Sequence, residues 1–246
     1  MTDLNIRLER YERQIIDEVI GVSGQEKLSH AKVAVIGVGG LGSSVVLYLA
    51  VAGVGELGLV DCDSVQLSNL NRQVLYTPSD ISCKKTVLAE QRVHAINPDI
   101  TVVTFDTYVD NSNAEEIIAP YDIVIDATDN FDSKFMLNDI CVKMKKPLIH
   151  AGAHGFVGQI MVITPESSCL RCFMTNIPDE GYANNNPRPI IGVTAGVLGQ
   201  LQATETLKYI MNAGNLLVNK ILFIDLLNMD FRKKDIPKNK ACSVCS

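Results

Sequence analysis

The feature that most constrains the fold is the stretch VAVIGVGGLGSSVVLYLA at residues 33–50, where an apolar run meets a glycine-rich turn and a second apolar run follows. Gly37, Gly39 and Gly42 have the spacing G-x-G-x-x-G, which lets a chain turn tightly from a strand into a helix and approach a phosphate. The N-terminus of that helix offers N–H groups and a partial positive charge to an anion. The stretch therefore predicts a nucleotide-binding turn, although the same glycines can serve only to pack a helix against a strand.

The rest of the first 150 residues repeats this alternation of strand and helix. A helical pattern at 5–20 comes first. Apolar runs then predict strands at 31–36, 57–60, 100–105, 121–127 and 147–151, with helices at 41–52, 84–96 and 131–144. Such alternation is typical of an α/β fold with a doubly wound, mostly parallel, Rossmann-like sheet.

After residue 155 the pattern changes. Residues 156–164 and 217–226 predict strands, and 190–211 predict a long helix that Gly192, Gly196 and Gly199 break or loosen. We therefore expect a single domain over residues 1–246, made of three parts. These are N-terminal helices at 1–30, a nucleotide-binding half at 31–155, and a part at 156–246 that completes the sheet.

Composition excludes several classes of protein. The net charge of -6 argues against a general nucleic-acid binder, which needs a basic face. The N-terminal residues are polar and charged, and no apolar run approaches the ~20 residues that span a bilayer. Seven cysteines without a secretory signal argue against a disulfide framework. We expect a soluble cytoplasmic protein with neither nucleic acid nor membrane as a partner.

The loop DCDSVQLSNLNRQ at residues 61–73 is dense in polar groups. Asp61 follows the second strand, where a carboxylate can accept hydrogen bonds from ribose hydroxyls. Arg72 and the pair Lys84–Lys85 could reach triphosphate oxygens, which suits nucleotidyl transfer better than hydride transfer, because reaction at phosphorus depends on positioning and charge neutralisation. The alternative is an ordinary solvated loop.

A second acidic cluster is DATDNFD at residues 126–132. Asp129 follows an apolar strand, at the edge of the sheet where ligands bind. A carboxylate beside a triphosphate commonly holds Mg²⁺. Asp129 or Asn130 could instead cap the next helix without any metal.

Two C-x-x-C pairs lie in the last part of the chain, Cys169–Cys172 and Cys242–Cys245. Four thiolates with no open position suit a structural zinc ion. Redox activity would need only one pair, placed where a helix opens after a strand, and neither pair is expected there. We expect zinc to hold the tail, including KKDIPKNK at 233–240, against the body. Cys62, Cys83, Cys141 and the four histidines are expected to be structural or bystanders.

Taken together, these motifs resemble the MoeB/ThiF/HesA family, the bacterial and archaeal relatives of ubiquitin-activating enzymes. The resemblance runs from about Arg10 to Cys245. It is carried by RYERQI (10–15), GVGGLG (37–42), the loop at 61–73, Lys85, DATDN (126–130), LQATE (201–205) and the two C-x-x-C pairs. It implies that ATP and Mg²⁺ are used to adenylylate the C-terminal glycine of a small ubiquitin-like sulfur carrier that ends in Gly-Gly, with release of pyrophosphate.

The resemblance also implies residue roles. Gly37, Gly39 and Gly42 would cradle ATP, Asp61 would hold the ribose with Asp63 beside it, and Asp129 would hold Mg²⁺. Asn69, Arg72 and Lys85 would contact the phosphates. Arg13 matches an arginine that reaches into the site of a partner subunit, which implies a homodimer with shared active sites.

One position departs from the family. Many relatives carry a cysteine that forms a covalent link to the carrier, and that position falls at about Asn185 here. No cysteine lies between Cys172 and Cys242. We therefore predict adenylylation only, with a mobile carrier-binding loop at 178–189 and with sulfur transfer left to another protein. Cys83 could substitute only if a loop moved.

Three other functions remain open. The first is the same chemistry on a peptide C-terminus in natural-product maturation. The second is an NAD-dependent oxidoreductase, which Arg72 and Lys85 disfavour. The third is a non-catalytic, zinc-stapled binding module, against which the presence of Arg72, Lys85 and Asp129 together argues.

Overall fold

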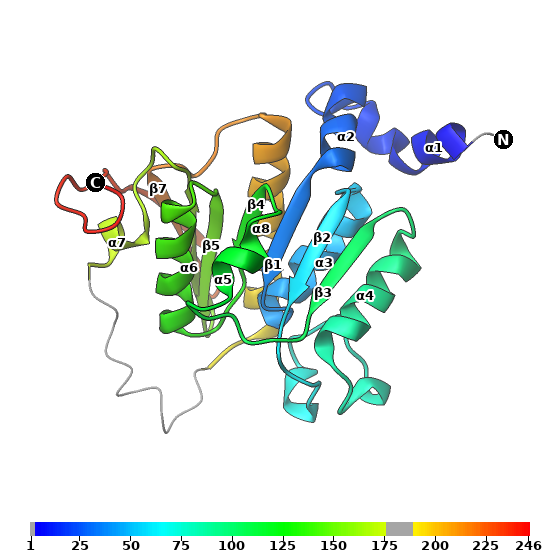
Figure 1. Ribbon diagram of the computed structural model, residues 1–246, viewed down its shortest axis with the longest axis horizontal. Helices are drawn as coiled ribbons and strands as arrows, with labels where there is room; N and C mark the ends of the chain where they lie inside the picture. The colour runs from blue at the N-terminus through cyan, green and yellow to red at the C-terminus, as the bar shows by residue number, and fades with distance from the viewer. Residues whose placement is uncertain (1–2, 176–188) are drawn as a thin grey trace.

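A computed structural model describes residues 3–175 and 189–246 of the chain. Within these ranges an eight-stranded sheet is flanked by helices on both faces (Figure 1). Its strands are β1 Lys32–Ile36, β2 Glu56–Val60, β3 Thr101–Phe105, β4 Ile123–Asp126, β5 Leu148–His154, β6 Val157–Ile163, β7 Lys220–Asp225 and β8 Asp230–Asp235. The helices are α1 Asp3–Ile15, α2 Gly21–His30, α3 Gly40–Ala52, α4 Lys85–Ile96, α5 Ala114–Ile118, α6 Phe131–Lys143, α7 Leu170–Phe173 and α8 Gly192–Met211, with short 3₁₀ helices η1 Leu67–Asn69 and η2 Pro78–Asp80.

The strand order is β3-β2-β1-β4-β5-β6-β7-β8. The first five strands in this order, from β3 to β5, pair in parallel with their neighbours. From β5 to β8, neighbouring strands pair antiparallel. Two apolar cores hold the layers together. One joins α3, α4 and α8 to one face of the sheet, and the other joins α5, α6 and α7 to the opposite face. The predicted doubly wound α/β fold is confirmed, and β1 and β4 form the point where the chain order reverses.

Helix α8 differs from its prediction, because it runs unbroken from Gly192 to Met211. Its glycines allow close packing rather than loosening the helix. A Cβ on Gly199 would lie 2.4 Å from the carbonyl oxygen of Leu41, and one on Gly192 would lie 2.6 Å from that of Asn71. Only a residue without a side chain lets α8 lie this close to α3 and to the loop that follows β2.

Both ends of the chain also correct the prediction. The helix expected at 5–20 ends at Ile15, and residues 16–20 form a turn before α2. In this turn Asp17 accepts a hydrogen bond from the N–H of Val19, and Gly21 follows it with φ +56°. At the other end, the first three residues of KKDIPKNK belong to β8, which is paired along its length with β7. A backbone ladder therefore orders the first part of a tail that was expected to depend on metal.

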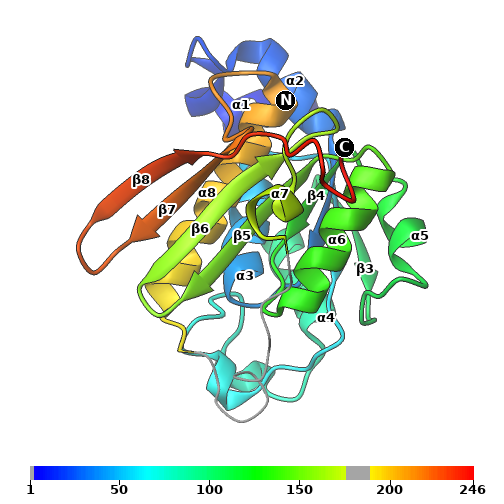
Figure 2. The same ribbon diagram turned by 90° about the vertical axis from the view of Figure 1, so that its left-hand side faces the viewer.

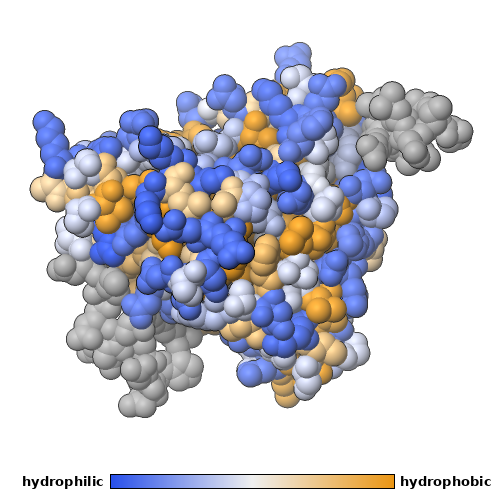
Figure 3. Space-filling model, in the orientation of Figure 1, coloured by the Kyte–Doolittle hydropathy of each residue, from blue (hydrophilic) through white to orange (hydrophobic). Residues whose placement is uncertain are grey.

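Figure 2 shows the hairpin of β7 and β8 extending from β6 at one side of the molecule, with α6 and α7 toward the other. The face in Figure 3 is largely hydrophilic, with smaller apolar groups between the polar ones. None of the helices in the described ranges is both long and apolar enough to cross a membrane. The predicted loop at 178–189 and Asn185 lie, apart from Pro189, outside the described residues.

Candidate active site

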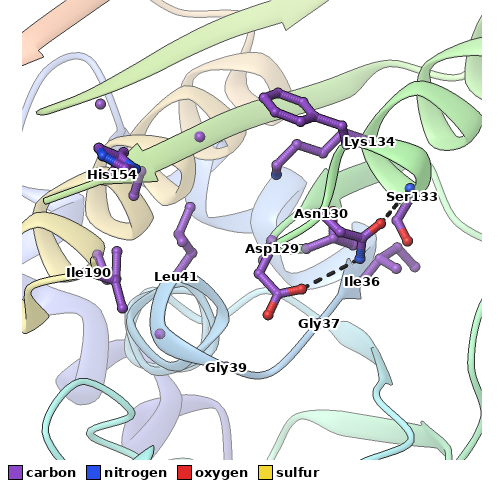
Figure 4. Close-up of a pocket in the computed structure, with 18 of the residues that line it drawn as sticks. Ile36, Gly37, Gly39, Leu41, Asp129, Asn130, Ser133, Lys134, His154 and Ile190 are labelled. Carbon is purple, nitrogen blue, oxygen red and sulfur yellow. Dashed lines mark hydrogen bonds between the residues drawn. The ribbon is translucent and has the colours of Figure 1, made fainter. Parts of the chain in front are cut away.

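A cavity of about 1560 Å³ lies at the carboxyl ends of the parallel strands. Its near end is lined by the glycine turn after β1, the end of β2 and the turn between β4 and α6, whereas its far end reaches Phe223 on β7 and Arg232 on β8. Figure 4 shows Gly37 and Gly39 facing this space together with Asp129, Asn130 and Lys134. This is the edge, and the switch point, at which open α/β sheets bind ligands.

The glycine turn is shaped by contacts that exclude side chains. Gly37 has φ +93°, and a Cβ there would lie 2.8 Å from the carbonyl oxygen of Ala127. A Cβ on Gly42 would lie 2.0 Å from the carbonyl oxygen of Gly37, so α3 begins directly against the turn. Gly39 is the N-cap residue of α3. The turn thus presents the N-terminus of a 13-residue helix to the cavity, as the sequence predicts.

Asp61, Asp63 and Lys85, hereafter the Lys85 cluster, lie beside this turn. Asp61 accepts hydrogen bonds from the N–H groups of Val38 (3.0 Å) and Asp63 (2.9 Å). The Lys85 Nζ lies 2.8 Å from Asp63 Oδ2 and 3.7 Å from Asp61 Oδ1. Burial raises the pKa of Asp61, and Lys85 opposes this only in part. The cluster holds a buried ammonium whose nearest carboxylate, Asp63, is 64% exposed.

Of the residues in and after the loop following β2 that were predicted to contact phosphates, some line the cavity and others do not. Arg72 lines the cavity and donates from Nη1 to the Ser68 carbonyl and to Asn71 Oδ1. Asn69 accepts from the N–H of Gln66 (3.0 Å), holds η1 and is not among the residues that line the cavity in the described part of the chain. Lys84 also lies outside this lining, with its Nζ 2.9 Å from Asp106.

In the turn between β4 and α6, one polar residue caps the helix and a different one presents its carboxylate to the cavity. Asn130 caps α6, because its Oδ1 accepts from the N–H of Ser133 at 2.8 Å. The exposed carboxylate of Asp129 faces the cavity, with Asn130 Nδ2 3.5 Å from its Oδ1 (Figure 4). Since Asn130 supplies the cap, Asp129 is not required for it.

A second buried ion cluster, Asp126, Lys134 and His150, was not predicted and is hereafter the Lys134 cluster. The Lys134 Nζ lies 3.2 Å and 3.3 Å from the two Asp126 oxygens and donates to the Ala151 carbonyl at 2.7 Å. His150 Nδ1 lies 2.7 Å from Asp126 Oδ2. Although burial alone would raise it, these neighbours hold the pKa of Asp126 well below its usual range, while burial lowers that of His150. The sequence signal was a lysine in the first turn of a helix that follows a strand ending in Asp.

Arg13 is not brought to this cavity. It lies on α1, whose neighbours are at the amino ends of the strands: Arg10 donates to the carbonyl of Ile96 before β3, and Gln14 to that of Ala52 before β2. Figure 1 shows α1 and α2 at one end of the molecule and the loop after β2, in cyan, at the opposite end. Arg13, whose side chain is exposed, therefore lies at the opposite end of the molecule from the cavity of its own chain (Figure 1).

The four cysteines of the two C-x-x-C pairs meet, with all four Sγ atoms within 4.8 Å of one another. Cys169 and Cys242 are 3.7 Å apart, and Cys172 and Cys245 are 3.4 Å apart. A tetrahedral ion with Zn–S bonds of about 2.3 Å needs S···S distances of about 3.8 Å, so the thiols fit zinc. Burial would raise the pKa of Cys242, but the N–H groups of Cys245 and Val244 lower it to about 7.

One step of the sequence argument on these cysteines is wrong. Cys169 is the N-cap residue of the short helix α7, so one pair does open a helix. The second pair at van der Waals distance, rather than the absence of a helix, is what favours a metal. Cys62 is exposed and lines the cavity, and Cys83 is exposed outside that lining. Cys141 lies on α6 and is buried in the second apolar core.

Comparison with known proteins agrees with this fold. Residues 11–244 match the model of the ThiF family. The chain is 39% identical to the sulfur carrier protein adenylyltransferase of Thermus thermophilus, covering 97% of this chain and 90% of that one. It is 38% identical to the SAMP-activating enzyme E1 of Haloferax volcanii, covering 97% and 89%. A crystal structure of E. coli MccB with ATP superimposes with a TM-score of 0.88 at 25% identity, covering 96% of this chain and 73% of that one.

The fold and the cavity at its switch point define a Rossmann-like nucleotide-binding protein. The chain belongs to the ThiF family, and it is an adenylyltransferase.

Proposed function

We propose that the protein uses ATP to adenylylate the C-terminal glycine of a small ubiquitin-like sulfur carrier of the ThiS or MoaD type. The observation that carries this proposal is the shape and lining of one cavity. The glycine turn, Arg72, Lys85 and Asp129 line it at one end, and it continues past them to Phe223 and Arg232. A nucleotide fills the first part and leaves the second for an extended chain end. The name of the Thermus thermophilus relative supports a sulfur carrier as the second substrate.

The chain's own groups suit attack of a carboxylate on the α-phosphorus of ATP. A carboxylate becomes an acyl donor once AMP is its leaving group, and the step needs cations that offset charge on the phosphates. Lys85 and Arg72 supply them, since each is held in place by loop carbonyls or by an exposed carboxylate that a phosphate oxygen can replace. Asp61, fixed by the N–H of Val38, accepts from the ribose, and Asn69 and Asp63 complete the phosphate loop.

Two metals belong to the proposal. Asp129 would hold Mg²⁺, since its carboxylate is exposed to the cavity beside the glycine turn and is free of the helix cap; the ion would neutralise charge on the phosphates. Cys169, Cys172, Cys242 and Cys245 would hold zinc, which would tie the C-terminal residues to the body. Metal analysis of the purified protein would find zinc, and Cys242→Ser would lose it.

No enzyme nucleophile is required for adenylylation. No cysteine is present between Cys172 and Cys242, so the carrier would leave as acyl-adenylate, and sulfur transfer would fall to another protein. Mass spectrometry after incubation with carrier and ATP would find no covalent enzyme–carrier species.

A homodimer with Arg13 acting in trans is the further part of the proposal. Arg13 is exposed at the opposite end of the molecule from its own cavity, so it could reach a cavity only in a second copy. Mixing Arg13→Ala with Asp129→Ala chains tests this. If both residues serve one shared site, random pairing restores about a quarter of wild-type sites from two inactive proteins. No recovery from a mixture shown to exchange subunits would exclude the trans role.

ATP–pyrophosphate exchange tests the proposal as a whole. We expect exchange that depends on a carrier ending in Gly-Gly and that falls roughly 10²- to 10³-fold in Asp129→Ala. Asp132→Ala is the matched control, because Asp132 lies three residues after Asp129, in the first turn of α6 and outside the lining of the cavity. Exchange supported by a peptide with a free C-terminus, and by no carrier, would establish the peptide alternative instead. Absence of ATP binding would reject both.

A further inference from the structure

Asp126 is buried at the centre of the site without facing the cavity. It is the last residue of β4, between β1 and β5, and it is 0% exposed. Taking an ionised carboxylate out of water costs several kcal/mol unless partners satisfy it. Here its carboxylate has four partner groups, namely Lys134, His150, and both the N–H and the hydroxyl of Thr128.

The bonds to Thr128 determine where Asp129 lies. Asp126 Oδ1 accepts from the N–H of Thr128 at 3.1 Å and from its Oγ1 at 2.6 Å. Asn130, on the other side of Asp129, is fixed as the cap of α6. Asp129 therefore sits between two residues whose side chains are both anchored, and its own carboxylate is left facing the cavity.

The surroundings of Asp126 keep this anchor rigid. The Asp126 carbonyl accepts from Gln202 Nε2 at 2.7 Å, which ties the strand end to α8. The next carbonyl, that of Ala127, lies against Gly37 so closely that a Cβ could not fit between them. The turn between β4 and α6 thus sets the distance between the glycine turn and Asp129. These are the two sides of the site that would hold phosphate and metal.

We propose that Asp126 is a positioning residue that aims Asp129 at the metal–nucleotide complex, acting through Thr128 and without touching the ligand. This rests on the proposed function, in which Asp129 holds Mg²⁺. Groups that orient a metal ligand from behind typically change metal affinity or activity 10- to 100-fold when they are removed. Thr128 and Asp126 would then matter to the metal and not to the nucleotide itself.

Thr128→Val tests this, because it removes the hydroxyl bond to Asp126 and keeps the shape of the side chain. Ser112→Ala is the matched control. Ser112 makes the same pair of bonds to Asp110, from its N–H at 2.8 Å and its Oγ at 2.6 Å, on an exposed turn outside the main cavity. Thr128→Ser keeps the hydroxyl and is the conservative rescue. Asp126→Asn extends the series if it folds, and the Thr128 variants suffice if it does not.

The readout is binding of Mn²⁺, by electron paramagnetic resonance, to each protein saturated with ATP. We expect Mn²⁺ affinity to fall roughly 10-fold or more in Thr128→Val and to remain near wild type in Thr128→Ser and Ser112→Ala. ATP affinity in EDTA should be unchanged. The melting temperature of Thr128→Val should fall by no more than about 4 °C, as for loss of one hydrogen bond.

The outcomes separate the two proposals. Wild-type Mn²⁺ affinity in Thr128→Val overturns the positioning role and leaves the proposed function standing. Equal losses of Mn²⁺ and metal-free ATP affinity also overturn it, since they indicate general disorder of the site. A wild-type protein that binds neither ATP nor Mn²⁺ overturns the proposed function, and the positioning role with it.

Discussion

Lys85 and Lys134 are both buried at the same edge of the sheet, and they differ in what their ammonium groups meet. Lys85 has one carboxylate at 2.8 Å, and that residue, Asp63, is largely exposed to solvent. Lys134 has both oxygens of the fully buried Asp126 and the Ala151 carbonyl of β5 within 3.3 Å. The first arrangement leaves a cation that an incoming phosphate can capture. The second arrangement neutralises the Lys134 ammonium within the protein, where it holds Asp126 in place.

The carboxylates show the same difference. Burial raises the pKa of Asp61, because Lys85 compensates it incompletely. For Asp126, burial is outweighed by Lys134, His150 and Thr128, and its pKa is lowered. In the proposed site, the charge of Asp61 is thus only partly compensated before a ligand binds, whereas that of Asp126 is compensated within the protein.

The largest expected effect is on stability. Lys134→Met should destabilise the protein by about 3–5 kcal/mol, because it removes the ammonium that compensates the buried charge of Asp126. The double variant with Asp126→Asn should recover part of this loss, since no buried charge then remains uncompensated. Urea unfolding of the single and double variants measures both quantities. A Lys134→Met protein as stable as wild type would break the comparison.

The next effect is on activity. Lys85→Met should lower carrier-dependent pyrophosphate exchange roughly 10²- to 10³-fold, because a cation that offsets phosphate charge is lost. Its free energy of unfolding should fall by less than that of Lys134→Met, since the carboxylate closest to Lys85, Asp63, is solvent-exposed whereas Asp126 is fully buried. Lys84→Met, which removes the neighbouring lysine paired with Asp106 on the surface, is the control. Equal activity in the two variants would contradict the role of Lys85.

The smallest effect is on pH dependence, and its sign distinguishes the clusters. Because the folded pKa of Asp61 is raised above its ordinary value of 3.8, its ionisation disfavours folding, and stability falls as pH rises from 3.8 through the raised pKa. Because the folded pKa of Asp126 is lowered, its ionised carboxylate favours folding. This contribution to stability is fully present above pH 3.8 and is lost as pH falls through the lowered pKa. Relative to Asp61→Asn, wild type should therefore lose stability with rising pH. Relative to Asp126→Asn, it should lose stability with falling pH. Denaturant midpoints measured across the acid range check both slopes, and slopes of the same sign would contradict the contrast.

The sequence predicted what local pattern determines. The strand–glycine–helix unit at Gly37 and the polar residues at strand ends depend on short-range chemistry, so the position of Asp61, Arg72 and Asp129 near one cavity could be expected. Whether Asp129 or Asn130 caps α6 could not, because either side chain can do so. The Lys134 cluster joins residues of β4, α6 and β5. The sequence shows an Asp at a strand end and a Lys in the first turn of the next helix, but it does not show that both meet His150.

Other misses have equally particular causes. The glycines of α8 suggested a loosened helix because sequence shows a missing side chain but not the backbone that packs into its place. Strand β8, DFRKKD, does not alternate apolar and polar residues, because it is an edge strand held by its hydrogen-bond ladder with β7. The roles of Arg13, Asn69 and the zinc ligands stay predictions.

The central claim is that this cavity joins AMP to a carrier's terminal carboxylate, and the fate of labelled ATP tests it most directly. With ATP labelled at the α-phosphate and a carrier ending in Gly-Gly, we predict label on the carrier, released by hydroxylamine, in wild type and Lys84→Met but not in Lys85→Met. With ATP labelled at the γ-phosphate, the carrier should stay unlabelled and the label should leave in pyrophosphate. Transfer of the γ-label, or α-label bound to the enzyme instead of the carrier, would contradict the account.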